Sequence, residues 1–172
     1  MRVRSCVCVC VAVVMLLGCG GGGGSTPKEG FEAFKAAMSD KNFEDAWKQM
    51  STETQRLMNE DAAKIAEQAN KSEGPARIAL ETQAKAMGLT WEKMKKLDGK
   101  ALFIGAYTMA TMPSQGGKEQ WQKISRAQFS RVEQEGSRAK VYVKLDDKED
   151  TDRPLMLVLE EGKWRVDLTE PK

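Results

Sequence analysis

The sequence contains no histidine, and its four cysteines all fall within the first 19 of its 172 residues. Histidine is the commonest general base near neutral pH and a principal ligand of zinc and other transition metals. The chain has neither a Gly-x-Ser-x-Gly nucleophile elbow nor a Gly-Lys-Ser/Thr phosphate loop. We therefore predict no catalytic residue, no metal site and no cofactor.

The N-terminus differs in composition from the rest of the chain. Arg2 and Arg4 provide positive charge, and an uninterrupted apolar run follows from Val7 to Leu17. This order is typical of an export signal. The run is too short for a membrane-spanning helix, which needs roughly 20 apolar residues. We therefore predict that residues 1–18 form a signal peptide that is removed from the mature protein.

The end of the apolar run carries a specific motif. Leu16-Leu17-Gly18-Cys19 resembles the lipobox of bacterial lipoproteins. The resemblance implies cleavage before Cys19, attachment of a diacylglyceryl group to its thiol, and acylation with palmitate. The alternatives are an ordinary signal peptide that happens to contain cysteines, and an uncleaved anchor. The agreement of charge, run length, small residue and cysteine favours the lipobox.

The same resemblance implies a location. The cysteine is followed by Gly20 and not by the aspartate that would retain a lipoprotein in an inner membrane. The family sorting rule therefore predicts a lipid anchor on the cell membrane. In a cell with two membranes, it predicts an anchor in the outer membrane with the protein facing the periplasm.

Removal of the signal simplifies the mature protein. Cys6, Cys8 and Cys10 leave with it, so no disulfide is predicted. Loss of two arginines from the 27 basic residues leaves 25, which equals the 25 acidic residues. A nearly neutral protein lacks the basic footprint of a nucleic-acid-binding domain, so no nucleic-acid partner is predicted. Residues 19–27 are predicted to be the lipidated cysteine and a flexible, glycine-rich tether, and residues 28–172 a single domain.

The first half of the domain has a helical pattern. Thr26 and Glu29 are spaced as a capping box for a helix that starts at Pro27. Further amphipathic segments lie between residues 43 and 97, separated by polar or glycine-containing breaks. Ala101 to Met112 has no charged residue and could be a buried helix or a strand. Because alanine, methionine and leucine dominate this segment, we predict a helix.

The second half of the domain has sequence patterns that are typical of strands. Gln128 to Gln134 is one predicted strand, and residues 141–145 alternate between apolar and polar. Asp146 to Asp152 is predicted to be a charged loop. Leu155 to Leu159 forms a further strand, and Glu161-Gly162 a tight turn. The last predicted strand buries one face through Trp164, Val166 and Leu168. The fold class is therefore α+β, with N-terminal helices packed on a C-terminal antiparallel sheet.

Two segments resemble a known family. TPKEGFEAFKAAMSDKNFEDAWKQMSTETQ is similar to the first helices of small bacterial lipoproteins with an NTF2-like, cone-shaped domain. PLMLVLEEGKWRVDL is similar to their closing hairpin. The similarity covers residues 26–55 and 127–168, whereas residues 56–125 match poorly and contain more helix than the family has. The resemblance implies a curved sheet around an N-terminal helix, with a conical cavity between them.

Acidic residues are the remaining candidates for chemistry. Asp40, Glu44 and Asp45 cluster at a predicted helix junction, where one of them could act as a base in a cavity. A helix cap on a solvated face is the simpler interpretation of this cluster. The Asp146 to Asp152 segment could hold calcium through oxygen ligands. Its spacing lacks the calcium-loop pattern, so a solvated loop is favoured.

Aromatic residues offer a second set of candidates. Trp47 and Trp164 occupy apolar positions of a helix and a strand, so they are assigned to the core. Tyr107 lies in the uncharged segment, where a buried hydroxyl requires a partner. We therefore predict Tyr107 as a ligand-binding residue in the cavity.

The superfamily includes isomerases, dehydratases and binding modules, so the fold alone does not select a function. The missing catalytic residues favour a non-enzymatic, membrane-anchored envelope module that binds a small apolar ligand or a protein partner. The alternative is an isomerase or hydrolase that uses a cavity carboxylate such as Asp45. A third hypothesis is a structural accessory that stabilises an envelope complex.

Overall fold

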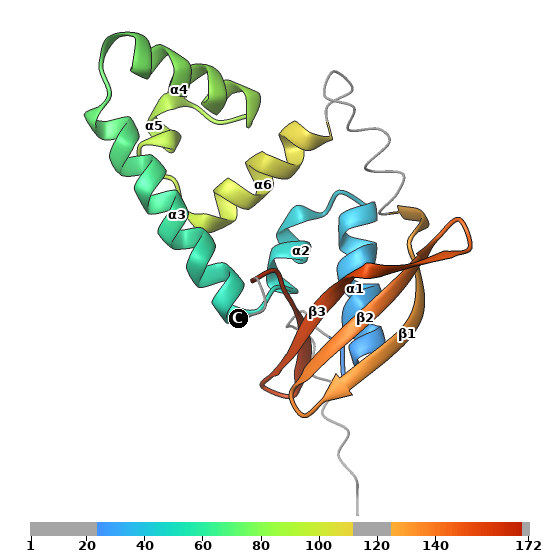
Figure 1. The fold of residues 1–172 in the computed structure, drawn as a ribbon. Coiled ribbons are helices and arrows are strands. Elements are labelled where there is room, and N and C mark those ends of the chain that lie inside the picture. The colour runs from blue at the N-terminus through green and yellow to red at the C-terminus, as the bar shows by residue number, and fades with distance from the viewer. Residues whose placement is uncertain (1–23, 112–124, 170–172) are drawn as a thin grey trace, which may run out of the picture.

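The computed structural model describes residues 24–111 and 125–169, apart from the side chains of residues 152 and 153. Within these ranges the helices come first and the strands follow (Figure 1). The helices are α1 (Pro27–Ser39), α2 (Phe43–Lys48), α3 (Thr52–Lys71), α4 (Gly74–Ala86), α5 (Trp91–Met94) and α6 (Gly99–Ala110). The strands are β1 (Gln128–Glu135), β2 (Arg138–Leu145), β3 (Lys148–Glu160) and β4 (Lys163–Asp167). The predicted α+β class is confirmed, as is the helix in the uncharged segment.

The four strands form an antiparallel meander in the order β1-β2-β3-β4. The predicted loop from Asp146 to Asp152 is wrong, because β3 already begins at Lys148. Asp146 and Asp147 make the whole turn, with φ of 50° and 63°. Aspartate tolerates this left-handed conformation, and two such residues suit a tight hairpin. Glu149 and Asp150 therefore lie in the paired part of β3, opposite Lys144 and Val143.

Helix α1 lies across one face of the sheet (Figure 1). Its capping box is confirmed, since Glu29 N donates to Thr26 Oγ1 over 3.2 Å and the Glu29 carboxylate accepts from Thr26 N. Gly30 allows α1 to approach closely, because a Cβ there would lie 2.7 Å from the Trp164 carbonyl oxygen and 2.9 Å from a Leu157 methyl group. The buried residues of this core, here called the sheet core, are Phe31, Ala139, Val141, Leu157, Trp164 and Val166.

The prediction that the last strand buries Trp164, Val166 and Leu168 is only partly correct. Trp164 and Val166 are buried in the sheet core. Leu168 remains 42% exposed because β4 ends at Asp167 and the chain turns away from the sheet.

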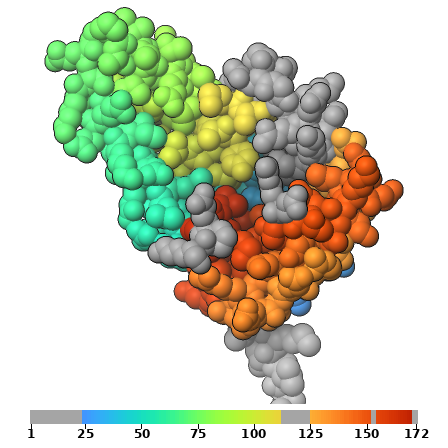
Figure 2. All heavy atoms as spheres, viewed as in Figure 1, coloured from blue at the N-terminus to red at the C-terminus, as the bar shows by residue number. Residues whose placement is uncertain are grey.

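Helices α3 to α6 form a separate helical lobe that stands beside the sheet (Figures 1 and 2). This lobe contains most of the segment that matches the resembled family poorly. Its own core is made of small and flexible side chains, with Ala62, Ala69, Ala84, Met94 and Leu97 buried. Alanine at these positions lets the helices approach closely, whereas α4 leaves Ile78 65% exposed.

A third core joins the helical lobe to α1 and α2. Phe103 of α6 is fully buried against Met38, Ala46 and Met50. Its ring centroid lies 5.9 Å from that of Trp47. This junction core is the main apolar connection between the two halves.

The domain begins earlier than predicted. Gly24 forms a β-bridge with Trp164, whose amide donates to the Gly24 carbonyl over 2.8 Å. Ser25 and Thr26 both donate to the Glu29 carboxylate. Residues 24–27, predicted as part of the flexible tether, therefore belong to the folded domain.

Candidate functional site

The space between α1 and the sheet is filled by side chains of the protein. The large residues of the sheet core, among them Phe31, Leu157 and Trp164, are each at most 4% exposed. Three depressions that are lined by described residues lie elsewhere on the surface. A conical cavity, which the family resemblance implies, is therefore not the place at which to look for a ligand.

Tyr107, the predicted ligand-binding residue, packs in the junction core. Its ring centroid lies 4.7 Å from that of Phe103 and 6.0 Å from that of Phe43. Burial raises the pKa of its hydroxyl above the ordinary value. Tyr107 does not line the depressions over the outer face of the sheet, and its packing contacts supply no argument for a ligand.

Asp45, the candidate base, lies on the exposed N-terminal turn of α2. It accepts hydrogen bonds from Lys48 Nζ and Asn42 Nδ2, each over 2.6 Å. The Lys48 ammonium lowers the pKa of the Asp45 carboxyl, whereas a general base near neutral pH requires a raised one. Glu44 pairs with Lys100 of α6 over 3.0 Å. The geometry of both acids is that of surface ion pairs.

The described acidic residues that were considered as calcium ligands, between Asp146 and Asp152, do not gather into a metal site. Within residues 24–111 and 125–169, no group of three or more histidine, cysteine or acidic residues is arranged to hold a metal ion. Glu149 instead faces Arg131, with 3.1 Å between Oε1 and Nε. The two tryptophans assigned to the core are found there, Trp47 partly buried and Trp164 buried.

The clearest hollow surface lies on the outer face of the sheet, opposite α1. Two depressions of about 490 and 800 Å³ both include Arg138 and Met156. The first lies over the β1–β2 hairpin, and the second continues to the start of α3 at Leu57. We call this continuous surface the outer groove.

The floor of the outer groove is apolar. Met156 and Val158 alternate along β3 with the inward-facing Leu155 and Leu157. Both are partly buried, and Leu57 is 37% exposed beside them. An antiparallel sheet with one face in water normally alternates apolar and polar residues. Strand β3 therefore has apolar side chains on both faces, although among the described helices only α1 packs against the sheet, on its inner face.

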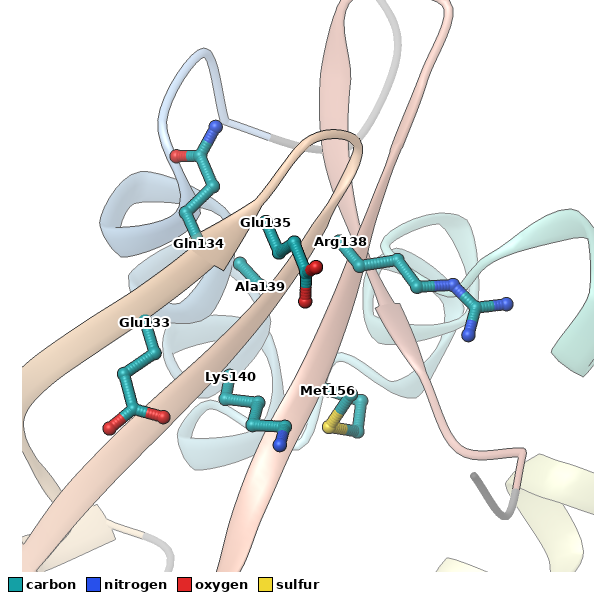
Figure 3. A pocket seen from close by; sticks show the side chains of 7 residues that line it. All are labelled: Glu133, Gln134, Glu135, Arg138, Ala139, Lys140 and Met156. Atoms are coloured by element: carbon teal, nitrogen blue, oxygen red, sulfur yellow. The ribbon is translucent and has the colours of Figure 1, made fainter. Parts of the chain in front are cut away.

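Two cations border this floor. Lys140 is the register partner of Met156, and Arg138 is that of Val158. Figure 3 shows Lys140 beside Met156, with Arg138 extending beyond β3. Neither cation forms an ion pair with another described residue. The outer groove thus combines apolar surface with two cations that stand opposite Glu133 and Glu135 of β1 in the strand register.

Two of the neighbouring charges on β1, Arg131 and Glu133, are already engaged. The Arg131 guanidinium lies 3.6 Å from the Tyr142 ring centroid and pairs with Glu133. This pairing lowers the pKa of the Glu133 carboxyl, and the Tyr142 hydroxyl donates to the same carboxylate over 3.0 Å. These contacts fix the wall of the groove, and the nearby Lys140 ammonium also contributes to the lowered pKa of Glu133.

A polar cluster closes the other end of the groove. Asp167 Oδ1 accepts hydrogen bonds from Thr54 Oγ1 over 3.2 Å and from Thr169 Oγ1 over 2.8 Å. Ser51 Oγ also donates to it over 3.3 Å. Ser51 and Thr54 are buried, and Ser51 caps α3 by accepting a hydrogen bond from Thr54 N. The cluster thereby fixes the start of α3 against the end of β4.

We expect Asp167→Ala to lower the free energy of unfolding by about 1.5–3 kcal/mol, because the buried hydroxyls lose a charged acceptor. Urea unfolding followed by circular dichroism measures the change. Asp61→Ala is the matched control, because it removes an exposed carboxylate that pairs only with Lys64. Its expected effect is below about 1 kcal/mol. Equal effects of the two substitutions would contradict a structural role for Asp167.

Comparison with known proteins identifies no relative. No family model, curated protein or solved structure matches the chain. No helix in the described ranges is both long and apolar enough to cross a membrane. The function must therefore be argued from the chain itself.

The outer groove was not predicted, although the sequence carried a signal for it. Leu155 to Leu159 is continuously apolar, in contrast to the alternation of residues 141–145. Such a run indicates a strand covered on both faces. Arg138 and Lys140 had no comparable signal, because only the strand register places them beside that run.

Proposed function

We propose that this protein is a bacterial envelope lipoprotein whose domain is a non-enzymatic binding module. Lipid on Cys19 would hold it on a membrane, which in a two-membrane cell is the outer membrane facing the periplasm. The outer groove would bind a protein partner. The observation that carries this proposal is the second apolar face of β3, which Met156 and Val158 form and which no helix within residues 24–111 and 125–169 covers.

The partner we propose offers an apolar side chain flanked by acidic residues. Met156 and Val158 would accept the apolar group, and Arg138 and Lys140 would pair with the acids. Interfaces commonly combine an apolar centre with a charged rim that sets specificity. The filled space beneath α1 favours this protein partner over a small ligand held inside the sheet.

For the fold, we propose a filled variant of the NTF2-like cone with an added helical lobe. Supporting this are α1 packed on an antiparallel sheet and the closing hairpin that places Trp164 beneath it. The lobe occupies the part of the sequence that departs from the family. Its insertion between α2 and β1 leaves the contact of α1 with the sheet intact.

The anchor would keep the outer groove close to a membrane. Cys19 precedes Gly24, the first residue that the structure describes, by five positions. A fully extended chain covers at most about 3.3–3.6 Å per residue, so this connection spans no more than about 18 Å. The proposed partner is therefore itself attached to, or held near, the same membrane.

Site-specific photocrosslinking in living cells tests the proposal. A photoreactive amino acid replaces Met156 in the outer groove or, as a control, Ile78 on the far helical lobe. We expect a protein adduct of discrete mass from position 156 and none from the highly exposed position 78. Mass spectrometry then identifies the partner.

A charge reversal shows whether the adduct depends on the proposed chemistry. Arg138→Glu combined with Lys140→Glu should lower the adduct yield about tenfold or more, because it opposes like charges across the interface. Lys64→Glu combined with Lys71→Glu makes the same change of net charge on α3 and should leave the yield unchanged. Equal yields from both double variants would overturn the proposed docking surface.

A further inference from the structure

The two edges of the sheet differ in how the described chain covers them. At the β4 edge, Trp164 N donates to the Gly24 carbonyl and Val166 N to the Gln49 carbonyl, each over 2.8 Å. At the opposite edge, β1 pairs only with β2 within residues 24–111 and 125–169 (Figure 1). In an antiparallel pair, alternate residues direct their backbone groups away from the partner strand. Strand β1 therefore presents backbone donors and acceptors to which a further strand can bind.

The usable part of this edge follows a β-bulge. The register with β2 shifts between Phe129 and Arg131 and is regular from Arg131 to Glu135. A bulge disrupts pairing locally, so residues 131–135 are the stretch that another strand can join. Every residue of this stretch is exposed, including Val132, which is 38% exposed. Val132 stands opposite the buried Val141 and therefore lies on the inner face, at the margin of the sheet core.

The charges on this stretch limit how a second copy of β1 can join it. Three charged residues, Arg131, Glu133 and Glu135, share the outer face, and Val132 and Gln134 alternate with them. Two copies can pair antiparallel about a twofold axis perpendicular to the sheet, which keeps every residue on its own face. Residues directly opposite each other point to the same face, so one residue must lie on the axis opposite its own copy.

Only one position of the axis within residues 131–135 avoids repulsion. An axis at Arg131, Glu133 or Glu135 places identical charges directly opposite each other, which is destabilising. An axis at Gln134 places Glu133 opposite Glu135 of the second copy. An axis at Val132 instead places Arg131 opposite Glu133 of the second copy, and it does so twice. It also brings the two exposed valine side chains together.

We infer that two copies of this chain pair through β1, with Val132 on the twofold axis, and form one continuous antiparallel sheet. Arg131 and Glu133 already pair within each chain, but both side chains remain about half exposed. A guanidinium has five donors and a carboxylate accepts several hydrogen bonds, so each can bind the second copy as well.

This pairing does not rest on the proposed partner or on the lipid anchor. Strand β1 uses its edge for the second copy and leaves the outer face of the sheet open. Points related by a twofold axis lie at the same level along it. Both copies of Gly24 therefore lie at one level, and two chains anchored in the same membrane can still pair.

Light scattering of the purified full chain in detergent measures its oligomeric state. We expect a dimer for the wild type. Arg131→Glu and Glu133→Arg should each weaken self-association about tenfold or more, because each places like charges opposite each other twice. Lys71→Glu makes the same change of net charge as Arg131→Glu at an exposed site on α3 and should leave the dimer unchanged. A wild type that stays monomeric across the concentration series would overturn the inference.

Mixing the two single variants tests the register itself. One variant has two acids at positions 131 and 133 and the other has two arginines, so a mixed dimer restores both cross-strand pairs. Differently tagged chains of the two variants should therefore co-purify as a dimer, although each variant alone is largely monomeric. The double variant Arg131→Glu with Glu133→Arg should dimerise by itself. This rescue also excludes unfolding as the cause of the single effects. Single variants that dimerise like the wild type, or a mixture that stays monomeric, would contradict pairing through β1.

Discussion

Replacing Phe103 with alanine is expected to lower the free energy of unfolding by about 3–5 kcal/mol, the usual cost of deleting a buried aromatic ring. Phe103 is fully buried in the junction core and contacts residues from both α1 and α2. It is also packed against Tyr107, with 4.7 Å between ring centroids. Its removal therefore leaves a cavity where the helical lobe meets the rest of the domain.

The same substitution is expected to separate the unfolding of the two halves. The sheet core and the core of the helical lobe are distinct groups of residues, and the junction core links them. We expect this link to make the unfolding of the wild-type protein cooperative. Once Phe103 is lost, the lobe has only a core rich in alanine and should unfold at a lower urea concentration than the sheet.

Tryptophan fluorescence can follow each half independently. One variant retains only Trp91, which packs in the lobe, and another retains only Trp164, which lies in the sheet core. We expect coincident urea midpoints with Phe103 present and separate midpoints with Phe103→Ala. Ile78→Ala, an exposed control in the lobe, should change stability by no more than about 0.5 kcal/mol. Coincident midpoints in Phe103→Ala would show that the halves are coupled elsewhere.

Local sequence patterns predicted many of the elements but not how they pack. Capping at Thr26 and Asn42 depends on residues three positions away, so it can be read from the chain. The bridge from Gly24 to Trp164 depends on two distant segments meeting, and the tether was consequently predicted too long. Local patterns likewise do not predict the close approach of Met87 to Gly105, because these residues lie far apart in the sequence.

The failed prediction at the β2–β3 turn has a different cause. Asp146 to Asp152 was interpreted as a loop because charged residues are poor strand formers. In the structure, Glu149 pairs with Lys144 across the sheet and forms an ion pair with Arg131. Cross-strand partners of opposite charge thus compensate for low strand propensity. For Tyr107, the ligand-binding role stays a prediction, and the structure adds that its ring packs against the junction core.

Replacing Cys19 with serine is expected to abolish incorporation of radiolabelled palmitate and to block cleavage after Gly18. A thiol is required to form the thioether with diacylglycerol, and the resembled signal is cleaved only after that step. Metabolic labelling and the mass of the isolated chain measure both effects, which should be all-or-none. Serine is nearly the same size as cysteine, so the rest of the signal remains unchanged.

A matched variant distinguishes the lipobox from an ordinary signal peptide. Replacing Cys6, Cys8 and Cys10 together with serine leaves Cys19 in place, and this variant should be labelled and cleaved like the wild type. If Cys19→Ser were instead cleaved and released in soluble form, the segment would be an ordinary export signal. The lipid anchor would then be wrong, while the outer groove and its crosslinking test would still stand, because they depend only on the folded domain that begins at Gly24.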